Sequence, residues 1–484
     1  MSIATDVNTS IDTAVAPLSR AALAARIGES VRTPPVRIIH LGLGAFHRAH
    51  QAWYTDQVDD NGEWGIAAFT GRSAQAALEL SPQDGLYTLI ERSDAGDSAA
   101  LVSSIVEAVD GSDTARFVEL MAAESTALVT LTVTEAGYRL RADGSPDLGD
   151  SALAADLAFL ADNLDRAARG AISAGGPTTT LGRLVLGLEA RRLAGAGAIA
   201  IVPCDNMPDN GPLVERAVWA LATMLNAETA EWIAAHVAFV STSVDRITPK
   251  TTADDIAAAA GLTGWADRSP VVTEPFRDWV LSGHFPAGRP AWERAGARFV
   301  DDIEPFERRK LWLLNGAHSL LAYAGLLRGH DSVAAAMADP VCRGWVNDFW
   351  DDAVRHLPAG LLALDEYRAA LIERFDNTRI EHRLAQISAE AVTKLRVRIA
   401  PVVLAERAEG RQAAAGIRAI ASWASLVLAG RQMVDAEAAQ IGVIAARPTD
   451  AAIAGLVALV DARLAQDAAI LADITALVGE YQAE

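Results

Sequence analysis

The stretch Val36-Arg-Ile-Ile-His-Leu-Gly42-Leu-Gly44-Ala-Phe46-His47-Arg48-Ala-His50 decides the fold of this chain. Its first residues are a short β-branched run that predicts a buried strand, and a Gly-x-Gly turn and a helical pattern follow. Strand, glycine turn and helix form a cradle for a pyrophosphate, because glycine lets the backbone approach the phosphates and the helix N-terminus offers free N–H groups. The sequence therefore predicts a dinucleotide site at Gly42 and Gly44, with Arg48 as a nearby cation.

Two departures from the usual dinucleotide fingerprint concern the cofactor. His47 stands where a third glycine is expected. The second strand, 64–69, usually ends in an acid that holds the ribose 2′-hydroxyl, but here Thr70-Gly-Arg72 follows it. An arginine at this place can accommodate a 2′-phosphate, so these residues alone lean toward NADP or a relaxed preference.

Strand and helix patterns alternate in the first half of the chain and change in the second half. Strand candidates at 36–41, 64–69, 128–133 and 198–202 alternate with helical stretches such as 183–194, which predicts a parallel sheet covered on both faces. After the Gly- and Pro-rich segment 283–290, helical periodicity covers 306–327, 331–356, 364–374, 379–392, 412–430 and, with a break near its start, 448–481. We therefore predict an α/β protein with a Rossmann-type domain over residues 1–285, beginning with an arm at 1–33, and a mainly α-helical domain over 286–484.

The composition argues against several functional classes. The chain has 484 residues, 51% of them hydrophobic, and a net charge of −20, which repels nucleic acid and anionic membrane surfaces. Cys204 and Cys342 are the only cysteines, so neither a disulfide framework nor a Cys-rich zinc site is expected, and no third ligand accompanies His47 and His50. With no apolar stretch of membrane-spanning length and no signal-peptide pattern, we expect a cytoplasmic protein, a monomer or weak oligomer, that acts on a small molecule.

A second stretch, Lys310-Leu-Trp-Leu-Leu-Asn315-Gly-Ala-His318, places an amine, a carboxamide and an imidazole in an apolar helical pattern. On an ideal α-helix Asn315 lies about 140° from Lys310, and His318 falls between them at about 80°. Burial lowers the proton affinity of a lysine, which can then act as a general base near neutral pH. The alternative is a solvated helix start.

Several separated motifs give the chain a family resemblance. It resembles the polyol-specific long-chain dehydrogenases, the family of mannitol 2-dehydrogenase and fructuronate reductase, over roughly residues 36–480. Besides the two stretches above, the resemblance rests on Gln83-Asp-Gly-Leu-Tyr87, Leu131-Thr-Val-Thr-Glu-Ala-Gly-Tyr138, Cys204-Asp-Asn-Met-Pro-Asp-Asn-Gly211, Val244-Asp-Arg-Ile-Thr-Pro249 and Glu274-Pro-Phe-Arg-Asp-Trp279. It implies a Rossmann-type domain, a helical domain and a site between them. It also implies metal-free hydride transfer between a nicotinamide cofactor, usually NAD, and a secondary alcohol or ketone.

The resemblance also assigns roles to residues. Lys310 matches the catalytic lysine, Asn206 and Asn315 the two donors to the reacting oxygen, His318 the substrate-orienting histidine, and Glu307 a glutamate that helps proton exchange. Asp245 matches an aspartate near the nicotinamide. From the residues alone, Asn206 can equally belong to a turn, Asp245 to a surface ion pair and Glu307 to a first helical turn. The predicted cofactor-binding set is Gly42, Gly44, Phe46, His47, Arg48, Thr70, Arg72, Thr134, Glu135 and Asp245.

One departure from the family pattern concerns the substrate. Where the family has Asp-Gly-Ser-x-Lys, this chain has Glu390-Ala-Val-Thr-Lys394. A uronate carboxylate could be bound by a basic pocket of Arg379, His382, Lys394 and Arg398, although these residues also fit a solvated basic helix face. We expect conversion of D-fructuronate to D-mannonate, or of D-fructose to D-mannitol. The alternatives are another polyol such as arabinitol, a catalytically silent dinucleotide-binding protein and, disfavoured by the cysteine count, a zinc-dependent dehydrogenase.

Overall fold

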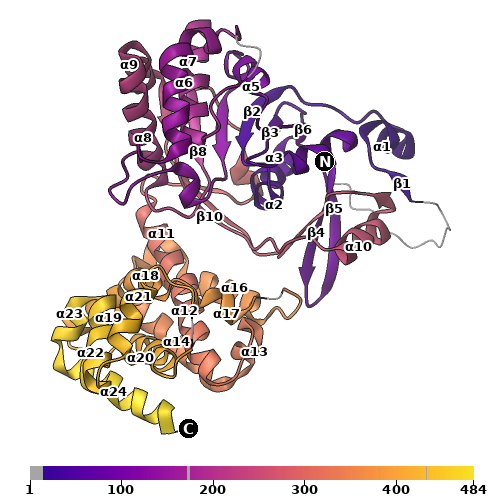
Figure 1. The fold of residues 1–484 in the computed structure, drawn as a ribbon. Coiled ribbons are helices and arrows are strands. Elements are labelled where there is room, and N and C mark those ends of the chain that lie inside the picture. Colours follow the sequence, from indigo (N-terminus) through magenta and orange to yellow (C-terminus); the bar gives the residue numbers. More distant parts are fainter. Residues whose placement is uncertain (1–14, 172–174, 381, 432, 484) are drawn as a thin grey trace. The chain divides into compact units, whose positions relative to one another are not determined.

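The computed structural model describes residues 15–171, 175–380, 382–431 and 433–483 (Figure 1). The chain divides into two compact units, Met1–Ile303 and Glu304–Glu484, which are described separately below as unit 1 and unit 2. The first 14 residues of the expected N-terminal arm lie outside the described part. The rest of the arm contains β1 (Ala16–Pro17), paired with β11 (Trp265–Ala266), and the helix α1 (Arg20–Ile27).

Unit 1 contains a six-stranded parallel sheet. The order is β6 (Ile105–Val109), β3 (Gly65–Phe69), β2 (Val36–Leu41), β7 (Leu128–Leu131), β8 (Ile199–Pro203) and β9 (Val237–Phe239). The four strands expected from the sequence are β2, β3, β7 and β8, so the predicted Rossmann-type sheet is confirmed.

Both faces of this sheet are buried, which explains why its strands are continuous apolar runs. Side chains alternate between two cores along each strand, so Ile38 and Ile39 belong to different ones. One core contains residues of α6 (Ser151–Ala168), α7 (Thr180–Ala194) and α8 (Asn210–Leu225), which run beside the sheet in Figure 1. The other includes Trp53 and Tyr54 of α3 (Trp53–Val58) and the buried Trp279 and Trp292.

Two three-stranded sheets in unit 1 were not expected from the sequence. The strand β4 (Tyr87–Ser93) pairs antiparallel with β5 (Gly96–Val102) and parallel with β12 (Val271–Thr273). In the other sheet, β13 (Asp278–Ser282) lies between β10 (Ser241–Asp245) and β14 (Arg298–Phe299). Pairing of β13 with β14 includes residues up to 299 in unit 1, so the change in composition near residue 285 precedes the division of the chain at Ile303.

Unit 2 is built from helices alone among its described residues. In order these are α11 (Glu304–Arg309), η5 (Lys310–Gly316), α12 (Ala317–Leu320), η6 (Leu321–Gly325), α13 (Val333–Ala338), α14 (Pro340–Val354), α15 (Ala359–Leu362), α16 (Leu364–Asp376), α17 (Leu384–Ile387), α18 (Ala391–Arg398), α19 (Ala400–Ala408), α20 (Ala414–Leu428), α21 (Ala438–Ala445), α22 (Thr449–Val460), α23 (Ala462–Gln466) and α24 (Ala468–Ala483). The expected mainly α-helical second domain is confirmed. Trp350 of α14 and Trp423 of α20 are fully buried in it.

Besides the helix expected at 448–481, which is divided into α22, α23 and α24, two of the expected helices in unit 2 are wrong in detail. The expected helix at 379–392 is mostly absent, because only the one-turn α17 forms there and α18 begins at Ala391. The expected helix at 331–356 is broken at Asp339-Pro340. Asp339 is extended and its side chain accepts from Val341 N, so it caps α14, and Pro340 takes the first helical position, where a proline costs no hydrogen bond. Among the described residues, no helix is long and apolar enough to span a bilayer.

A single arginine fixes two chain segments that lead into the sheet. Arg191 of α7 is 1% exposed, and its guanidinium donates hydrogen bonds to the carbonyl oxygens of Met121, Ala123, Ala196, Gly197 and Ala198. These carbonyls precede β7 and β8. Burial lowers the pKa of Arg191 to about 10, so the side chain stays charged at neutral pH.

Replacing Arg191 by lysine tests this network. An ammonium group has three donors and no planar fork, so Arg191→Lys leaves buried carbonyls unpaired, each at a cost of about 1–3 kcal/mol. We expect the free energy of unfolding, measured by urea titration, to fall by about 2–4 kcal/mol. Arg169→Lys is the matched control, because the Arg169–Asp165 pair is exposed and such pairs contribute at most about 1 kcal/mol. Equal stability of the two variants would contradict this account.

Candidate active site

The glycine turn after β2 is held against the neighbouring strands. The backbone N–H groups of Gly42 and Leu43 both donate to Phe69 O at the end of β3, at 3.0 and 2.9 Å. Gly42 has φ +114°, and a Cβ there would lie 2.3 Å from Thr132 O, so only glycine fits. At Gly44 the nearest atom to a Cβ is 3.5 Å away, so the backbone there is open to a ligand. Gly44 is also the N-cap of α2 (Ala45–His47), with no side chain bonded to the cap.

A chain of hydrogen bonds connects this turn to β2 and β7 and to the residue that follows β7. The Thr132 hydroxyl donates to Gly42 O at 2.8 Å, while the ring nitrogens of His40 lie 2.8 Å from Thr130 Oγ1 and 3.0 Å from Thr132 Oγ1. The His47 ring is stacked on His40, with ring centroids 3.3 Å apart. Burial lowers the pKa of His40 to about 3 and that of His47 well below its usual value. Both imidazoles are therefore neutral, and His47 is placed in the core under the turn.

Arg48 is also directed into the protein. It is 7% exposed; its Nε donates to Gly44 O at 3.3 Å and its Nη1 to the carbonyl and, at 3.0 Å, the hydroxyl of Ser269. These contacts fix the turn to a segment more than 200 residues later in the sequence. Phe46 is stacked on His50, with ring centroids 5.0 Å apart.

The remaining residues of the expected cofactor set follow strands of unit 1. Thr70, after β3, is buried and its hydroxyl accepts from Gly111 N at 2.8 Å, whereas Arg72 is exposed. Thr134 and Glu135 are exposed after β7, and Asp245 is the buried last residue of β10. Since β2, β3 and β7 are parallel neighbours, their carboxyl ends share one edge of the sheet, where dinucleotides bind in such folds.

Asn206 lies in a turn after β8 that hydrogen bonds of the preceding residue hold in place. The preceding Asp205 is buried; its Oδ1 accepts from Met207 N at 2.9 Å and its Oδ2 from the Tyr138 hydroxyl at 2.6 Å. Asn206 itself is exposed. The strand end and this buried carboxylate together direct the Asn206 segment.

In unit 2, Lys310 and Asn315 lie on a π-helix. The segment η5 spans Lys310–Gly316, so the ideal α-helix assumed from the sequence is wrong here. In a π-helix the hydrogen bonds run from residue i to i+5, which brings residues five apart close to the same face. Lys310 and Asn315 are five residues apart, so the angle between them around the helix axis is smaller than the roughly 140° expected for an α-helix. Both are partly buried, as is Glu307 in the preceding α11.

Packing explains where this π-helix lies. Gly316 ends η5, and a Cβ on it would meet the Phe349 ring of α14 at 2.5 Å. The absence of a side chain therefore lets the π segment approach α14 closely. Trp350 Nε1 donates to Leu313 O at 2.7 Å, which fixes the same segment from the next residue of α14.

His318 of α12 is a buried, neutral imidazole surrounded by cations. Its ring centroid lies 4.7 Å from that of Phe375 and 4.6 Å from that of His382, and its Nε2 has no hydrogen-bond partner among the described residues. Burial lowers its pKa well below the usual value, and positive charge from His382, Arg374, Arg398 and Lys394 adds to the effect. The structure therefore brings the expected substrate-binding residues His382, Lys394 and Arg398 near His318, and it shows Arg379 as exposed.

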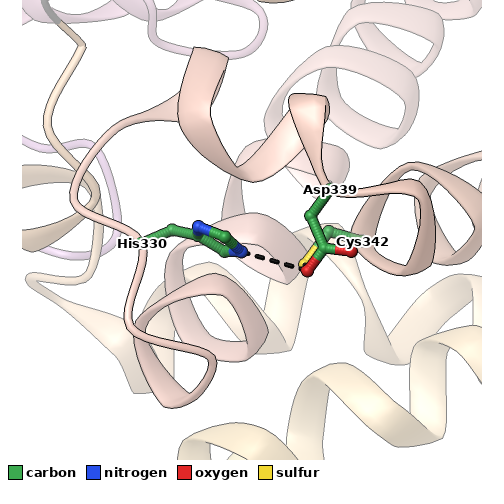
Figure 2. A group of neighbouring side chains, drawn as sticks. All are labelled: His330, Asp339 and Cys342. Carbon is green, nitrogen blue, oxygen red and sulfur yellow. Dashed lines mark hydrogen bonds and ion pairs between the residues drawn. The ribbon is translucent and has the colours of Figure 1, made fainter.

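A group of possible metal ligands in unit 2 was not predicted from the sequence, because only the break between α13 and α14 brings its members together. Figure 2 shows His330, Asp339 and Cys342, whose ligand atoms lie within 4.8 Å of one another. Asp339 Oδ2, however, already accepts from Arg328 Nε at 2.6 Å and lies 3.0 Å from His330 Nε2. Burial raises the pKa of the Cys342 thiol to about 11. The arginine balances the carboxylate charge, so this geometry fits a hydrogen-bonded cap of α14.

Comparison with known proteins agrees with both units. Residues 36–294 match the mannitol dehydrogenase Rossmann domain, and residues 302–481 match the mannitol dehydrogenase C-terminal domain. The D-mannonate oxidoreductase of Escherichia coli (strain K12) is 36% identical over 376 residues, covering 75% of this chain and 74% of that protein. The mannitol 2-dehydrogenase of Cereibacter sphaeroides is 37% identical over 351 residues, covering 71% and 70%. Among solved structures, the Pseudomonas fluorescens mannitol 2-dehydrogenase in ternary complex with NAD and D-mannitol has 30% identity and a TM-score of 0.76, covering 97% of this chain and 95% of that one.

Alanine at the two glycines of the turn separates folding from cofactor binding. Gly42→Ala drives a Cβ into Thr132 O and should lower thermal stability as well as cofactor affinity. Gly44→Ala meets no protein atom closer than 3.5 Å, so the melting temperature should stay near that of the wild type. If the pyrophosphate lies against Gly44, NADH titration by fluorescence should nevertheless show about 10-fold weaker binding, the cost of roughly 1.4 kcal/mol. Unchanged NADH affinity in Gly44→Ala would remove this glycine from the cofactor site.

Proposed function

This chain belongs to the mannitol dehydrogenase family, and we propose that it is an NAD-dependent oxidoreductase that reduces D-fructuronate to D-mannonate with a lysine as acid and base. The predicted family, enzyme class and polyol or uronate substrate class are confirmed by the matched domains and relatives. The expected cofactor NAD agrees with the ternary complex of the P. fluorescens enzyme, and the open turn at Gly44 suits a pyrophosphate. The individual substrate and the residue roles are our proposal.

The chemistry requires one proton carrier and donors to a developing alkoxide. In the reduction, NADH supplies the hydride to the ketone carbon. Lys310 gives a proton to the carbonyl oxygen, and in the reverse reaction its uncharged amine removes the proton of the alcohol. The carboxamides of Asn206 and Asn315 donate hydrogen bonds to that oxygen as negative charge grows on it. Glu307, three residues before Lys310 and partly buried, passes the proton on to solvent.

Removing the amine tests the role of Lys310. Lys310→Ala should lower kcat in both directions by about 10²–10⁴-fold, the usual contribution of general acid–base catalysis, with little change in NADH affinity. The matched control is Lys250→Ala, because Lys250 is exposed in unit 1. Steady-state rates followed by NADH absorbance across pH give the answer. A Lys310→Ala enzyme with wild-type turnover would exclude this lysine from the mechanism.

The preference for a uronate rests on one observation, the partly satisfied Arg398. Its Nη1 donates weakly to Asn315 O at 3.4 Å and to Ser319 Oγ at 3.3 Å, while its buried Nε has no partner among the described residues. Burial lowers the pKa of Arg398 to about 10, so it is still a cation at neutral pH. A guanidinium that makes only two long hydrogen bonds next to Asn315 suits a substrate carboxylate, which its terminal nitrogens can bind in a bidentate manner.

Lys394 strengthens this cationic environment. Its Nζ donates to Ile387 O at 2.9 Å, which leaves two of its three donors for other groups. Burial and the Arg398 charge lower its pKa to about 8, although the acids Glu390 and Asp435 oppose this shift. Both carboxylates already accept hydrogen bonds from the backbone. Glu390 accepts from Ala436 N, and Asp435 accepts from Val392 N and Glu437 N. The positive charge near His318 therefore favours an anionic sugar over a neutral polyol.

An apolar side chain at position 398 should change the substrate preference. Arg398→Met removes the proposed carboxylate partner, so kcat/KM for D-fructuronate should fall about 10–100-fold, as expected for a hydrogen bond to a charged group. The value for D-fructose should change much less. Arg396→Met is the control on the same helix, because Arg396 is exposed and donates to Val460 O and Leu459 O. Equal losses for both substrates in Arg398→Met would count against the uronate.

The same pocket predicts a pH dependence of the preference. Lys394 is protonated below its pKa of about 8 and loses its charge above it. The ratio of kcat/KM for D-fructuronate to that for D-fructose should therefore decline as pH rises past about 8. Any titration of Lys310 affects both sugars and cancels in the ratio. A flat ratio between pH 6 and 10 in the wild type, or the same decline in Lys394→Met, would contradict the assignment.

A second candidate function is interconversion of D-mannitol and D-fructose. It is favoured by the relatives named mannitol 2-dehydrogenase, which are as similar to this chain as the D-mannonate oxidoreductase. A panel of D-fructuronate, D-fructose and D-arabinitol with both NAD and NADP forms distinguishes these substrates and also tests Arg72 as a 2′-phosphate contact.

A further inference from the structure

We infer that Asn210 is a positioning residue for the active site, because its side-chain amide replaces a peptide group between β8 and β10. Asn210 is the first residue of α8 and is completely buried. Its Oδ1 accepts from Thr242 N at 2.9 Å, and its Nδ2 donates to Thr242 O at 3.1 Å. A residue on a neighbouring antiparallel strand would exchange the same two bonds with Thr242. The inference rests on the proposed function only in taking Asn206 and Asp245 as active-site residues.

The backbone pairing beside Asn210 ends just where this side chain is needed. The ladder between β8 and β9 pairs Ile199, Ala200 and Ile201 with residues 237–239, and Val240 N then donates to Ile201 O at 2.9 Å. Beyond this point, side chains continue the connection. The Thr242 hydroxyl donates to Pro203 O at 2.6 Å, and Asn210 Nδ2 lies 3.2 Å from the same carbonyl oxygen. Two side chains thus hold the end of β8 to β10.

This connection lies next to two of the residues assigned to the active site. Pro203 ends β8 three residues before Asn206, and Thr242 precedes Asp245, the last residue of β10, by three. Asn210 Nδ2 also lies 3.3 Å from Oδ1 of Asp205, the neighbour of Asn206. A shift of this amide would therefore move the segment that carries Asn206 relative to Asp245.

Neither aspartate nor leucine can replace the asparagine at this position. Aspartate has no donor, so its carboxylate would face the oxygens of Pro203, Thr242 and Asp205. Leucine has neither donor nor acceptor and would leave buried backbone groups unpaired. The backbone beside Asn210 is also closely packed on β10, because a Cβ on the next residue, Gly211, would lie 2.7 Å from Ser241 N.

Two variants of Asn210 and Thr242 test positioning by their effect on turnover. Asn210→Asp removes the hydrogen bonds that the side-chain amide donates. Thr242→Val removes only the hydroxyl that donates to Pro203 O. Both should lower kcat about 10–100-fold, since an ångström of misplacement at a reacting group costs that much. NADH affinity by fluorescence titration should stay within about threefold. Thr242→Ser, which keeps the hydroxyl, should restore most of the turnover lost in Thr242→Val.

A control separates positioning from loss of stability. Thr229→Val also deletes a buried hydroxyl. This hydroxyl donates to Glu189 at 2.7 Å and does not belong to the network of Asn210 and Thr242. It should lower the unfolding midpoint and leave kcat unchanged. Equal kcat for Thr242→Val and Thr242→Ser, or an Asn210→Asp enzyme as active as Thr229→Val, would overturn the inference. A wild type that reduces D-fructose but not D-fructuronate would refute only the proposed substrate, because the comparison of kcat is then made with D-fructose.

Discussion

Buried polar groups at the carboxyl ends of the parallel strands must find hydrogen-bond partners, and the organisation of unit 1 depends on this constraint. At the end of β2, the Thr132 hydroxyl binds Gly42 O, with His40 behind it. At the end of β8, Asn210 and Thr242 bind Pro203 O. Each network lies next to a segment that we propose to be part of the active site, the turn at Gly44 in the first case and the turn at Asn206 in the second. Buried hydrogen bonds therefore hold both turns in place.

In unit 2, the side chains that we propose for catalysis, Lys310 and Asn315, lie on a helix. The π-helix η5 places Lys310 and Asn315 five residues apart on nearly one face, and Gly316 lets this segment pack closely on α14. Farther along, the neutral His318 lies among Lys394, Arg398 and Arg374. Burial lowers the pKa values of Lys394 and Arg398, yet both remain charged at neutral pH. Unit 2 thus contains both the lysine that we propose as the proton carrier and the cations that we propose as substrate contacts, and all of them lie on its helices.

The sequence predicted what local signals determine. A β-branched run followed by two glycines needs no distant contact to be recognised, and β2 and its turn lie where expected. Local signals could not predict that the side chains of His47 and Arg48 are buried, because His47 stacks on His40 and Arg48 donates to Ser269, and neither partner is a sequence neighbour. The angle between Lys310 and Asn315 was wrong for a similar reason, since an α-helical pattern does not reveal a π-helix packed on Phe349. The hairpin β4–β5 and the break at Asp339 also depend on partners elsewhere in the chain. The roles of the site residues stay predictions.

The most direct test of the account is the rate of NADH oxidation with D-fructuronate after exhaustive dialysis against a chelator. If Lys310 carries the proton and amide donors stabilise the alkoxide, the dialysed enzyme should keep its full rate and prefer D-fructuronate to D-fructose. A rate that disappears on dialysis and returns with Zn²⁺, or a preference for the neutral ketose, would contradict it.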